Sequence, residues 1–206
     1  MKSKNLYLVL CSDCCRGGDP LDVAKEALLA GVDILQMREK NMSRPELLSF
    51  GKKLFRLCRE SGALFIVNDD PLLAAELEAD GVHLGQEDLL RFPLKETRRL
   101  LGREKIIGLS THSPDQFIKA NEQDFDYLAF GPVFPTKTKD YHIGTKDLSG
   151  VLKLASKPVM VIGGITKANV SELAALKVQN IAMIRALSEA ENINAAVRYF
   201  REVICR

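Results

Sequence analysis

Eight short apolar runs, each followed by a segment long enough for a helix, limit the fold of this chain more than any other feature. Strands that alternate with crossover helices lie parallel to one another, and eight such units in about 200 residues meet the lower size limit of a (β/α)8 barrel. A chain of 206 residues with 46% hydrophobic composition suits one core. We therefore predict an α/β fold, a single (β/α)8 TIM barrel that forms one domain over residues 1–206. The apolar runs cover residues 6–10, 34–37, 64–67, 82–84, 106–109, 127–130, 159–162 and 181–184.

Helix start signals follow several of these runs. An aspartate or serine followed by proline indicates an N-cap with proline in the first turn, and Ser43 with Glu46 matches a capping box. We expect a loop or broken turn over residues 88–92 before a helix at 95–101. The alternative is a doubly wound open sheet, but the text after the first run, CSDCCRGGD, lacks its glycine fingerprint. The cap-and-proline pairs are Asp19–Pro20, Asp70–Pro71 and Ser113–Pro114.

Charge and cysteine content exclude several classes of protein. The 29 basic and 27 acidic residues are spread along the chain, so we expect neither a nucleic acid nor a membrane as a partner. No apolar run approaches the roughly 18 residues of a membrane span, and we expect neither a signal peptide nor export, hence a cytoplasmic protein. The five cysteines suit reduced thiols, and a zinc site at Cys11 and Cys14 is the minority interpretation. The oligomeric state stays open, and a homo-oligomer is allowed.

Polar residues gather where the second, third and fourth runs end. In a barrel of this kind the chemistry lies at these ends. Side chains alternate along extended backbone, so Gln36, Arg38 and Lys40 share one face, which suits a phosphate. The next two ends supply carboxylates and amides, hard oxygen ligands that suit Mg2+ together with substrate phosphate. These residues are Asn68, Asp69, Asp70, Gln86, Glu87 and Asp88.

The later runs end in a different chemistry. The fifth ends at Ser110, and the sixth leads to hydroxyls and amines in the string GPVFPTKTK. Gly163 and Gly164 follow the seventh run, where missing side chains let backbone N–H groups approach an anion. The eighth ends at Ile184 and Arg185, completing a loop pair that often holds phosphate in barrel enzymes. The residues of the sixth loop that we single out are Thr136, Lys137, Thr138 and Lys139.

Each candidate also has an ordinary structural interpretation. Asp70 is better explained as a helix N-cap, which makes Asp69 the stronger metal candidate. Glu87 and His142 fit solvated loop residues and His83 a packed core residue, while His112 is balanced between the two interpretations. The collective placement at one end of one barrel favours a site. Carboxylates with cations on one half, and hydroxyls with backbone N–H groups on the other, suggest that two phosphorylated ligands are joined with diphosphate as the leaving group.

The strings QMREK, IVNDD, DGVHLGQED, GLSTH, DYLAFGPVFPTKTK and VIGGIT, in this order, resemble the thiamine-phosphate synthase family, also called thiamine-phosphate pyrophosphorylase. The resemblance runs from Leu6 to about Leu187. It implies a (β/α)8 barrel that couples a hydroxymethylpyrimidine diphosphate with a thiazole phosphate, giving thiamine phosphate and pyrophosphate.

The resemblance also implies roles for individual residues. The pyrimidine diphosphate would be held by Gln36, Arg38, Lys40, Asn68, Ser110 and Lys139, of which Arg38, Lys40, Lys139 and Ser110 would carry the reaction. The Mg2+ ligands would be Asp69 and Asp88. The thiazole phosphate would be held by Thr136, Thr138, Gly164, Ile184 and Arg185.

Three features depart from the family pattern. Arg185 stands where a serine is usual, with Lys177–Asn180 in place of a glycine-rich run; the loop over residues 139–145 is short; and the first run ends in CSDCC. Two alternatives remain: a related barrel that isomerises the thiazole, disfavoured because Pro132 replaces its histidine, and a non-catalytic ligand-binding barrel.

Overall fold

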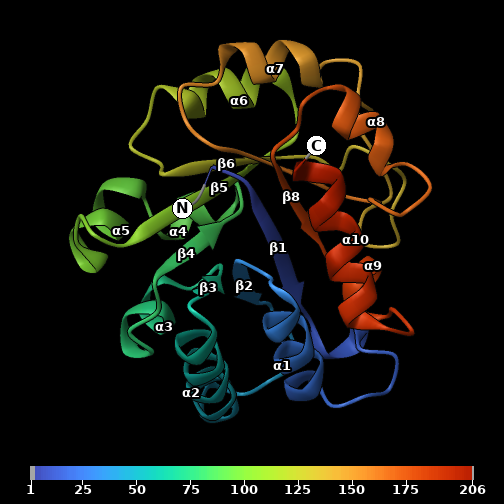
Figure 1. Ribbon diagram of the computed structural model, residues 1–206. Helices are drawn as coiled ribbons and strands as arrows, with labels where there is room; N and C mark the ends of the chain where they lie inside the picture. The colour runs from blue at the N-terminus through green and yellow to red at the C-terminus, as the bar shows by residue number, and fades with distance from the viewer. Residues whose placement is uncertain (1–2, 206) are drawn as a thin grey trace.

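The computed structural model, which describes residues 3–205, is a closed barrel of eight parallel strands in the order of the sequence (Figure 1). The predicted TIM barrel is confirmed, and each predicted run lies within one residue or two of an observed strand. Residues 1, 2 and 206 of the expected domain lie outside the described residues. The strands are β1 (Asn5–Leu10), β2 (Ile34–Met37), β3 (Leu64–Asn68), β4 (Gly81–Leu84), β5 (Ile106–Thr111), β6 (Tyr127–Phe130), β7 (Val159–Ile162) and β8 (Asn180–Met183).

Helices surround the barrel, and most begin at the capping signals that the sequence carries. Asp19, Asp70 and Ser113 each accept a hydrogen bond from a backbone N–H in the first helical turn, and each is followed by proline. The expected loop at 88–92 is corrected: residues Asp88–Arg91 form one helical turn, closed by the Phe92 N–H donating to the Asp88 carbonyl at 2.7 Å. The helices are η1 (Ser12–Cys14), α1 (Pro20–Ala30), α2 (Arg44–Ser61), α3 (Pro71–Glu76), α4 (Asp88–Arg91), α5 (Leu94–Leu101), α6 (Pro114–Asn121), α7 (Leu148–Leu154), α8 (Val170–Ala175), α9 (Arg185–Ser188) and α10 (Ile193–Cys205).

The apolar core has two layers, because side chains alternate across each strand. The larger layer lies between the strands and the helices, and a smaller cluster fills the barrel itself, including Tyr7, Tyr127 and Met160. Gly108 of β5 makes room for one of these rings, since a Cβ atom there would stand 2.1 Å from the Tyr127 ring. The inner layer therefore includes two tyrosines rather than aliphatic residues alone.

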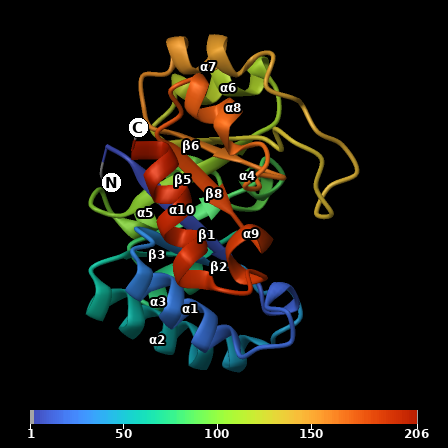
Figure 2. The ribbon, with the colours of Figure 1, turned by 45° about the vertical axis from the view of Figure 1, so that its right-hand side comes forward.

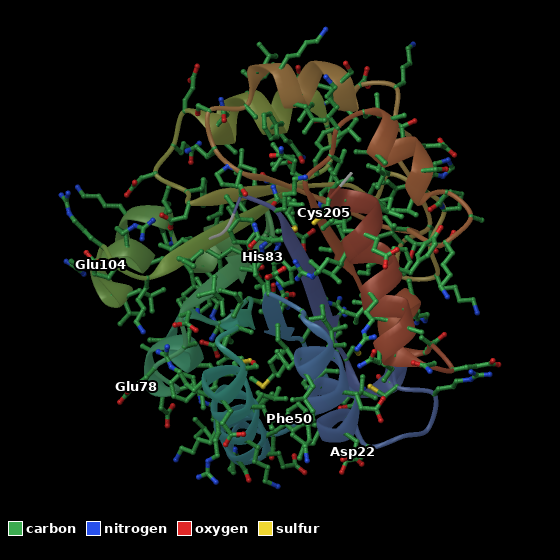
Figure 3. The ribbon with its side chains drawn as sticks, in the orientation of Figure 1. Asp22, Phe50, Glu78, His83, Glu104 and Cys205 are labelled. Carbon is green, nitrogen blue, oxygen red and sulfur yellow. The ribbon has the colours of Figure 1, made fainter. Side chains whose placement is uncertain are left out.

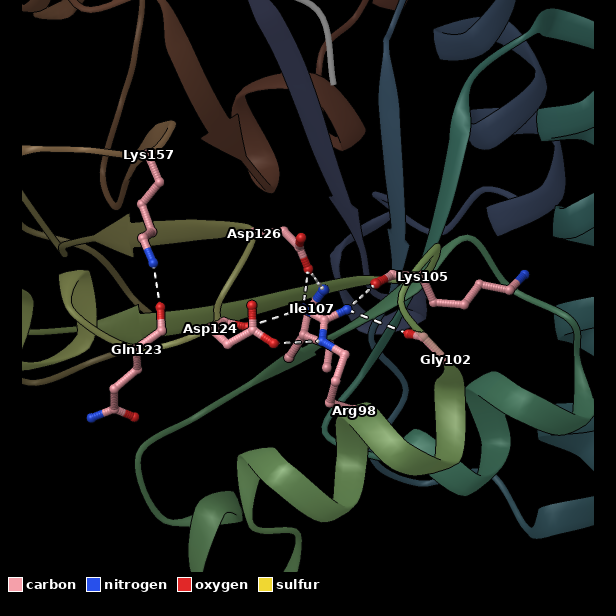
Figure 4. Close-up of polar contacts among 8 residues, drawn as sticks. All are labelled: Arg98, Gly102, Lys105, Ile107, Gln123, Asp124, Asp126 and Lys157. Atoms are coloured by element: carbon pink, nitrogen blue, oxygen red, sulfur yellow. Dashed lines mark hydrogen bonds and ion pairs between the residues drawn. The ribbon is translucent and has the colours of Figure 1, made fainter.

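A polar cluster fastens the barrel at the end where the strands begin (Figure 4). The guanidinium of Arg98, on α5, donates to the Lys105 carbonyl at 2.6 Å and to the Asp126 carboxylate at 2.7 Å. The same carboxylate accepts from the Ile107 N–H at 2.7 Å. These contacts tie α5 to the starts of β5 and β6, far from the strand ends that carry the candidate site.

The opposite end of the barrel is less tightly enclosed. Figure 2 shows the loop between β6 and α7 reaching away from the body of the barrel. None of the helices within residues 3–205 is both long enough and apolar enough to cross a membrane. The carboxyl ends of the strands therefore open at a mouth that the β6–α7 loop borders.

Candidate active site

A cavity of about 1320 Å³ occupies this mouth, and every residue that the sequence analysis assigned to catalysis, substrate or metal lines it. The strands deliver them there because all eight are parallel and end at the same rim. The assigned residues are Gln36, Arg38, Lys40, Asn68, Asp69, Asp88, Ser110, Thr136, Thr138, Lys139, Gly164, Ile184 and Arg185.

The alternation predicted after β2 is confirmed. Gln36, Arg38 and Lys40 line the cavity, whereas Met37 is buried on the helix side of the strand. The carboxylate of Glu39 faces away as well and accepts hydrogen bonds from the N–H and the hydroxyl of Ser12, both at 2.8 Å. Two cations and an amide thus line one side of the cavity, while Glu39 holds the turn after β1.

Asp69 and Asp88 form an acidic pair beside these cations. Asp69 has a left-handed backbone with φ of 62°, and its N–H donates to the His83 carbonyl at 2.8 Å. The Asp88 carboxylate accepts from the Gly85 N–H at 2.6 Å. Partial desolvation in the cavity wall raises the pKa of the Asp69 carboxyl, and the adjacent Asp88 raises it further, against the lowering effect of Arg38.

This donor set fits Mg2+. Two neighbouring carboxylates repel each other's negative charge, and a divalent cation bound between them would relieve that repulsion. Mg2+ commonly uses one or two carboxylates together with water and substrate phosphate. Within residues 3–205, no group of three or more His, Cys, Asp or Glu side chains is placed to hold a metal. The pair therefore matches an ion that shares its ligands with a substrate, rather than a fully protein-enclosed metal.

The neighbouring acids have other tasks, as the sequence predicted. Asp70 caps α3 by accepting from the Leu73 N–H at 2.9 Å, and it pairs with Arg44 at 2.7 Å. Glu87 lines the cavity but is exposed. Asp69 is therefore the residue of the Asp69–Asp70 pair that is available to a ligand.

Hydroxyls and a guanidinium form the opposite half of the cavity. Arg185, at the start of α9, donates to the Thr138 hydroxyl at 3.3 Å and pairs with Glu189 at 3.0 Å. The Thr138 N–H donates to the Thr136 hydroxyl at 3.3 Å. Arg185 thus joins the β6–α7 loop to α9 and projects along the cavity rim, where the family pattern has a serine.

Gly164 is required by its surroundings. Its φ is 64°, and a Cβ atom would stand 2.3 Å from the Pro135 carbonyl oxygen. The Gly163 carbonyl accepts from the Phe134 N–H at 3.1 Å. The glycines therefore let the turn after β7 lie directly against the β6–α7 loop, which brings the two halves of this region together.

The floor of the cavity contains residues that the sequence analysis did not assign to the site. Tyr7, His83 and Tyr127 line it from inside the barrel, and Figure 3 shows His83 near the centre of the molecule. Burial lowers the pKa of His83 to about 4, so its ring is neutral, and burial raises the pKa of both tyrosines. The expectation that His83 is a packed residue is confirmed, although it also borders the cavity. The sequence did carry a signal for these three residues, because each is a polar residue at a strand position that points into the barrel.

The remaining histidines differ from each other. The ring of His112 lines the cavity, and its Nδ1 lies 2.6 Å from the Gly131 carbonyl oxygen. His142 is exposed, as expected. The five cysteines are all unpaired.

The barrel and its mouth define a (β/α)8 protein whose cavity is lined by cationic side chains, hydroxyls and an acidic pair suited to a divalent cation. Comparisons narrow this class. The family model described as "Thiamine monophosphate synthase" matches residues 6–187. The chain therefore belongs to the thiamine monophosphate synthase family.

Individual relatives agree over nearly the whole chain. A thiamine-phosphate synthase of Persephonella marina is 36% identical over 202 residues, 97% of this chain and 95% of the relative. One of Chlorobium luteolum is 40% identical over 193 residues, 92% of this chain and 90% of the relative. The solved structure of the thiamine phosphate pyrophosphorylase from Pyrococcus furiosus superposes with a TM-score of 0.87 at 34% identity, covering 98% of this chain and 96% of that one.

Proposed function

We propose that this chain is a thiamine-phosphate synthase, which couples 4-amino-2-methyl-5-hydroxymethylpyrimidine diphosphate with 4-methyl-5-hydroxyethylthiazole phosphate. The products are thiamine phosphate and pyrophosphate. The observation that carries the proposal is the division of one cavity into two chemically different halves, an acidic pair with cations near β2 to β4 and hydroxyls with Arg185 near β6 to β8. Such a division suits two phosphorylated ligands that meet between the halves.

The first half is suited to a diphosphate leaving group. Negative charge grows on that group as its C–O bond breaks. Arg38 and Lys40, together with Lys139 of the β6–α7 loop, stabilise this charge more in the transition state than in the ground state. Asp69 and Asp88 would hold Mg2+, which supplies additional positive charge to the diphosphate when bound. Asn68 and Ser110 add polar contacts at the same wall of the cavity.

The second half is suited to a monophosphate. Thr136 and Thr138 offer hydroxyls, and Arg185 offers a guanidinium that can form charge-assisted hydrogen bonds. The thiazole nitrogen carries no proton, so it can form a bond without a general base to the methylene carbon that loses the diphosphate. Holding the two partners in register supplies much of the acceleration, up to about 7–11 kcal/mol for well-oriented reactants.

Pyrophosphate release tests this function directly. We expect release only when the protein, Mg2+, the pyrimidine diphosphate and the thiazole phosphate are all present, with thiamine phosphate formed in equal amount. Each component is omitted in turn, and the products are separated by chromatography. Release that persists without the thiazole phosphate and yields no thiamine phosphate would show hydrolysis instead of coupling, and it would refute the proposal.

A further inference from the structure

A chain of hydrogen bonds crosses the inside of the barrel below the cavity, from β2 to β5. The Gln36 side-chain N–H donates to the Tyr7 hydroxyl at 2.7 Å, which lies 3.1 Å from the Tyr127 hydroxyl. Tyr127 lies 2.8 Å from His83 Nδ1, and His83 Nε2 lies 2.9 Å from the Ser110 hydroxyl. Every member except Ser110 is buried. The chain thus joins two residues of the proposed pyrimidine diphosphate site.

The direction of the chain follows from counting protons. Tyr7 accepts from Gln36, so its own proton must go to another oxygen. Within residues 3–205, Tyr127 is the partner that the structure offers it. If Tyr127 donated to Tyr7 instead, the buried Tyr7 proton would have no acceptor there, which is costly.

The donors and acceptors of the two remaining hydrogen bonds, from Tyr127 to His83 and from His83 to Ser110, are then determined. Tyr127, accepting from Tyr7, donates its proton to His83 Nδ1. A neutral histidine that accepts at Nδ1 carries its proton at Nε2, so His83 donates to the Ser110 oxygen. Every buried group in the chain is satisfied in this direction, and no link needs a charged residue.

The direction determines what each end shows to a ligand. The amide N–H of Gln36 is used inside the barrel, so the carbonyl oxygen of its side chain is held as an acceptor at the cavity. Ser110 already accepts from His83, so its own proton is available to donate. The floor therefore presents a fixed acceptor on β2 and a fixed donor on β5.

We infer that Tyr7, Tyr127 and His83 are positioning residues that make the floor selective for a heterocycle bearing an amino group at Gln36 and an anionic oxygen at Ser110. The inference rests on the proposed function and extends it to the basis of substrate selection. A ring that carries oxygen in place of the amino group would set an acceptor against the Gln36 carbonyl. Sites that are built to hydrogen-bond a substrate N–H reject analogues that lack it strongly.

Substrate binding tests the selectivity. Calorimetry with Mg2+ compares the aminopyrimidine diphosphate with its analogue in which oxygen replaces the amino group. We expect the wild-type protein to prefer the amino compound by at least about 100-fold. We expect Tyr7→Phe, which frees the Gln36 amide to turn over, to reduce that preference by about tenfold or more. Tyr199→Phe is the matched control, because Tyr199 is an exposed residue of α10 whose hydroxyl donates to the Lys167 carbonyl at 3.3 Å.

The outcomes separate the inference from the proposed function. An unchanged preference in a folded Tyr7→Phe variant would overturn the inference even if coupling activity is intact. A changed preference supports it even if turnover is absent, since only binding is measured. Circular dichroism checks that the variant retains its fold.

The tautomer of His83 gives a second test that needs no substrate. Nitrogen-15 NMR distinguishes a protonated from an unprotonated ring nitrogen, and the chain has three histidines to assign. We expect His83 to carry its proton at Nε2, and we expect Tyr127→Phe, which removes the Nδ1 partner, to change the Nδ1 signal. A proton at Nδ1 in the wild-type protein would reverse the chain and overturn the inference.

Discussion

Individual residues at the mouth divide into those that serve a ligand and those that serve the fold, and the Asp69–Asp70 pair shows the division. Both carboxylates follow β3, but Asp70 is used by the start of α3 and by Arg44. Asp69 instead lies beside Asp88 on the cavity wall. We therefore expect substitution of Asp69 to affect activity strongly and substitution of Asp70 to affect it little.

We expect Asp69→Ala to lower the rate of coupling by about 100-fold or more and to weaken its dependence on Mg2+, as for loss of a group that stabilises transition-state charge. Asp70→Asn is the matched control, because asparagine is also a good N-cap, and it should stay within a few-fold of wild type. Steady-state rates over a series of Mg2+ concentrations measure both. Equal losses in the two variants would mean that Asp69 acts only through the local backbone.

Arg185 is one of the residues at which this chain departs from the family pattern, and its contacts suggest a role in binding the second substrate. A partly exposed charge-assisted contact to phosphate contributes roughly 1 to 2 kcal/mol once solvent screening is allowed for. We expect Arg185→Ser to raise KM for the thiazole phosphate by about tenfold while kcat changes little. Arg16→Ser, which breaks an exposed pair with Glu191 at 3.6 Å, is the control. A lower KM in Arg185→Ser would show that the guanidinium crowds the pocket.

At the scale of the elements, the start of α2 has a capping box that links helix stability to pH. The Glu46 carboxylate accepts from the Ser43 N–H at 2.7 Å and from its hydroxyl at 2.6 Å. These hydrogen bonds lower the pKa of Glu46. Because the folded pKa lies below the unfolded one, the stabilisation is fully present above the unfolded value and is lost as pH falls through the folded value.

We therefore expect Glu46→Ala to lower Tm at pH 7, and we expect the difference from wild type to shrink as the pH falls below the unfolded pKa of glutamate, about 4.3. Glu60→Ala, on the exposed last turn of the same helix, should leave Tm nearly unchanged. Thermal unfolding followed by circular dichroism at several pH values measures the effect. A difference that grows toward acid pH would contradict the assigned role of the carboxylate.

The sequence predicts the elements well because their signals are local, whereas the contacts between elements are not. Capping residues such as Ser43 and Asp70 indicate where helices begin, and the apolar runs indicate the strands. The chain from Gln36 to Ser110 depends on residues in five strands that meet only in the closed barrel. The helical turn α4 was also missed, because a single turn carries little periodic pattern.

At the scale of the whole molecule, one end of the barrel stabilises the fold and the other end carries the cavity. Arg98 and the acids around it fasten α5 to the starts of β5 and β6, while the opposite rim carries the cavity and the β6–α7 loop. The separation lets the rim vary, as at Arg185, without weakening the end that holds the strands together. It also explains why residue types at strand ends were sufficient to predict many of the residues that line the cavity.

The thiols report whether the barrel opens as a unit. Cys11, Cys14, Cys15 and Cys58 are buried, and Cys205 alone of the described cysteines is exposed. Burial raises the pKa of Cys15 and of Cys58 to about 12, so neither is a thiolate near neutral pH.

We expect one thiol per chain to react rapidly with a colorimetric disulfide reagent at pH 8, and Cys205→Ser to abolish that phase. Because the buried thiols lie on the turn after β1 and on α2, they should react together at the rate of global unfolding. A second rapid thiol in the native protein would mean that the turn after β1 opens independently of the rest of the barrel.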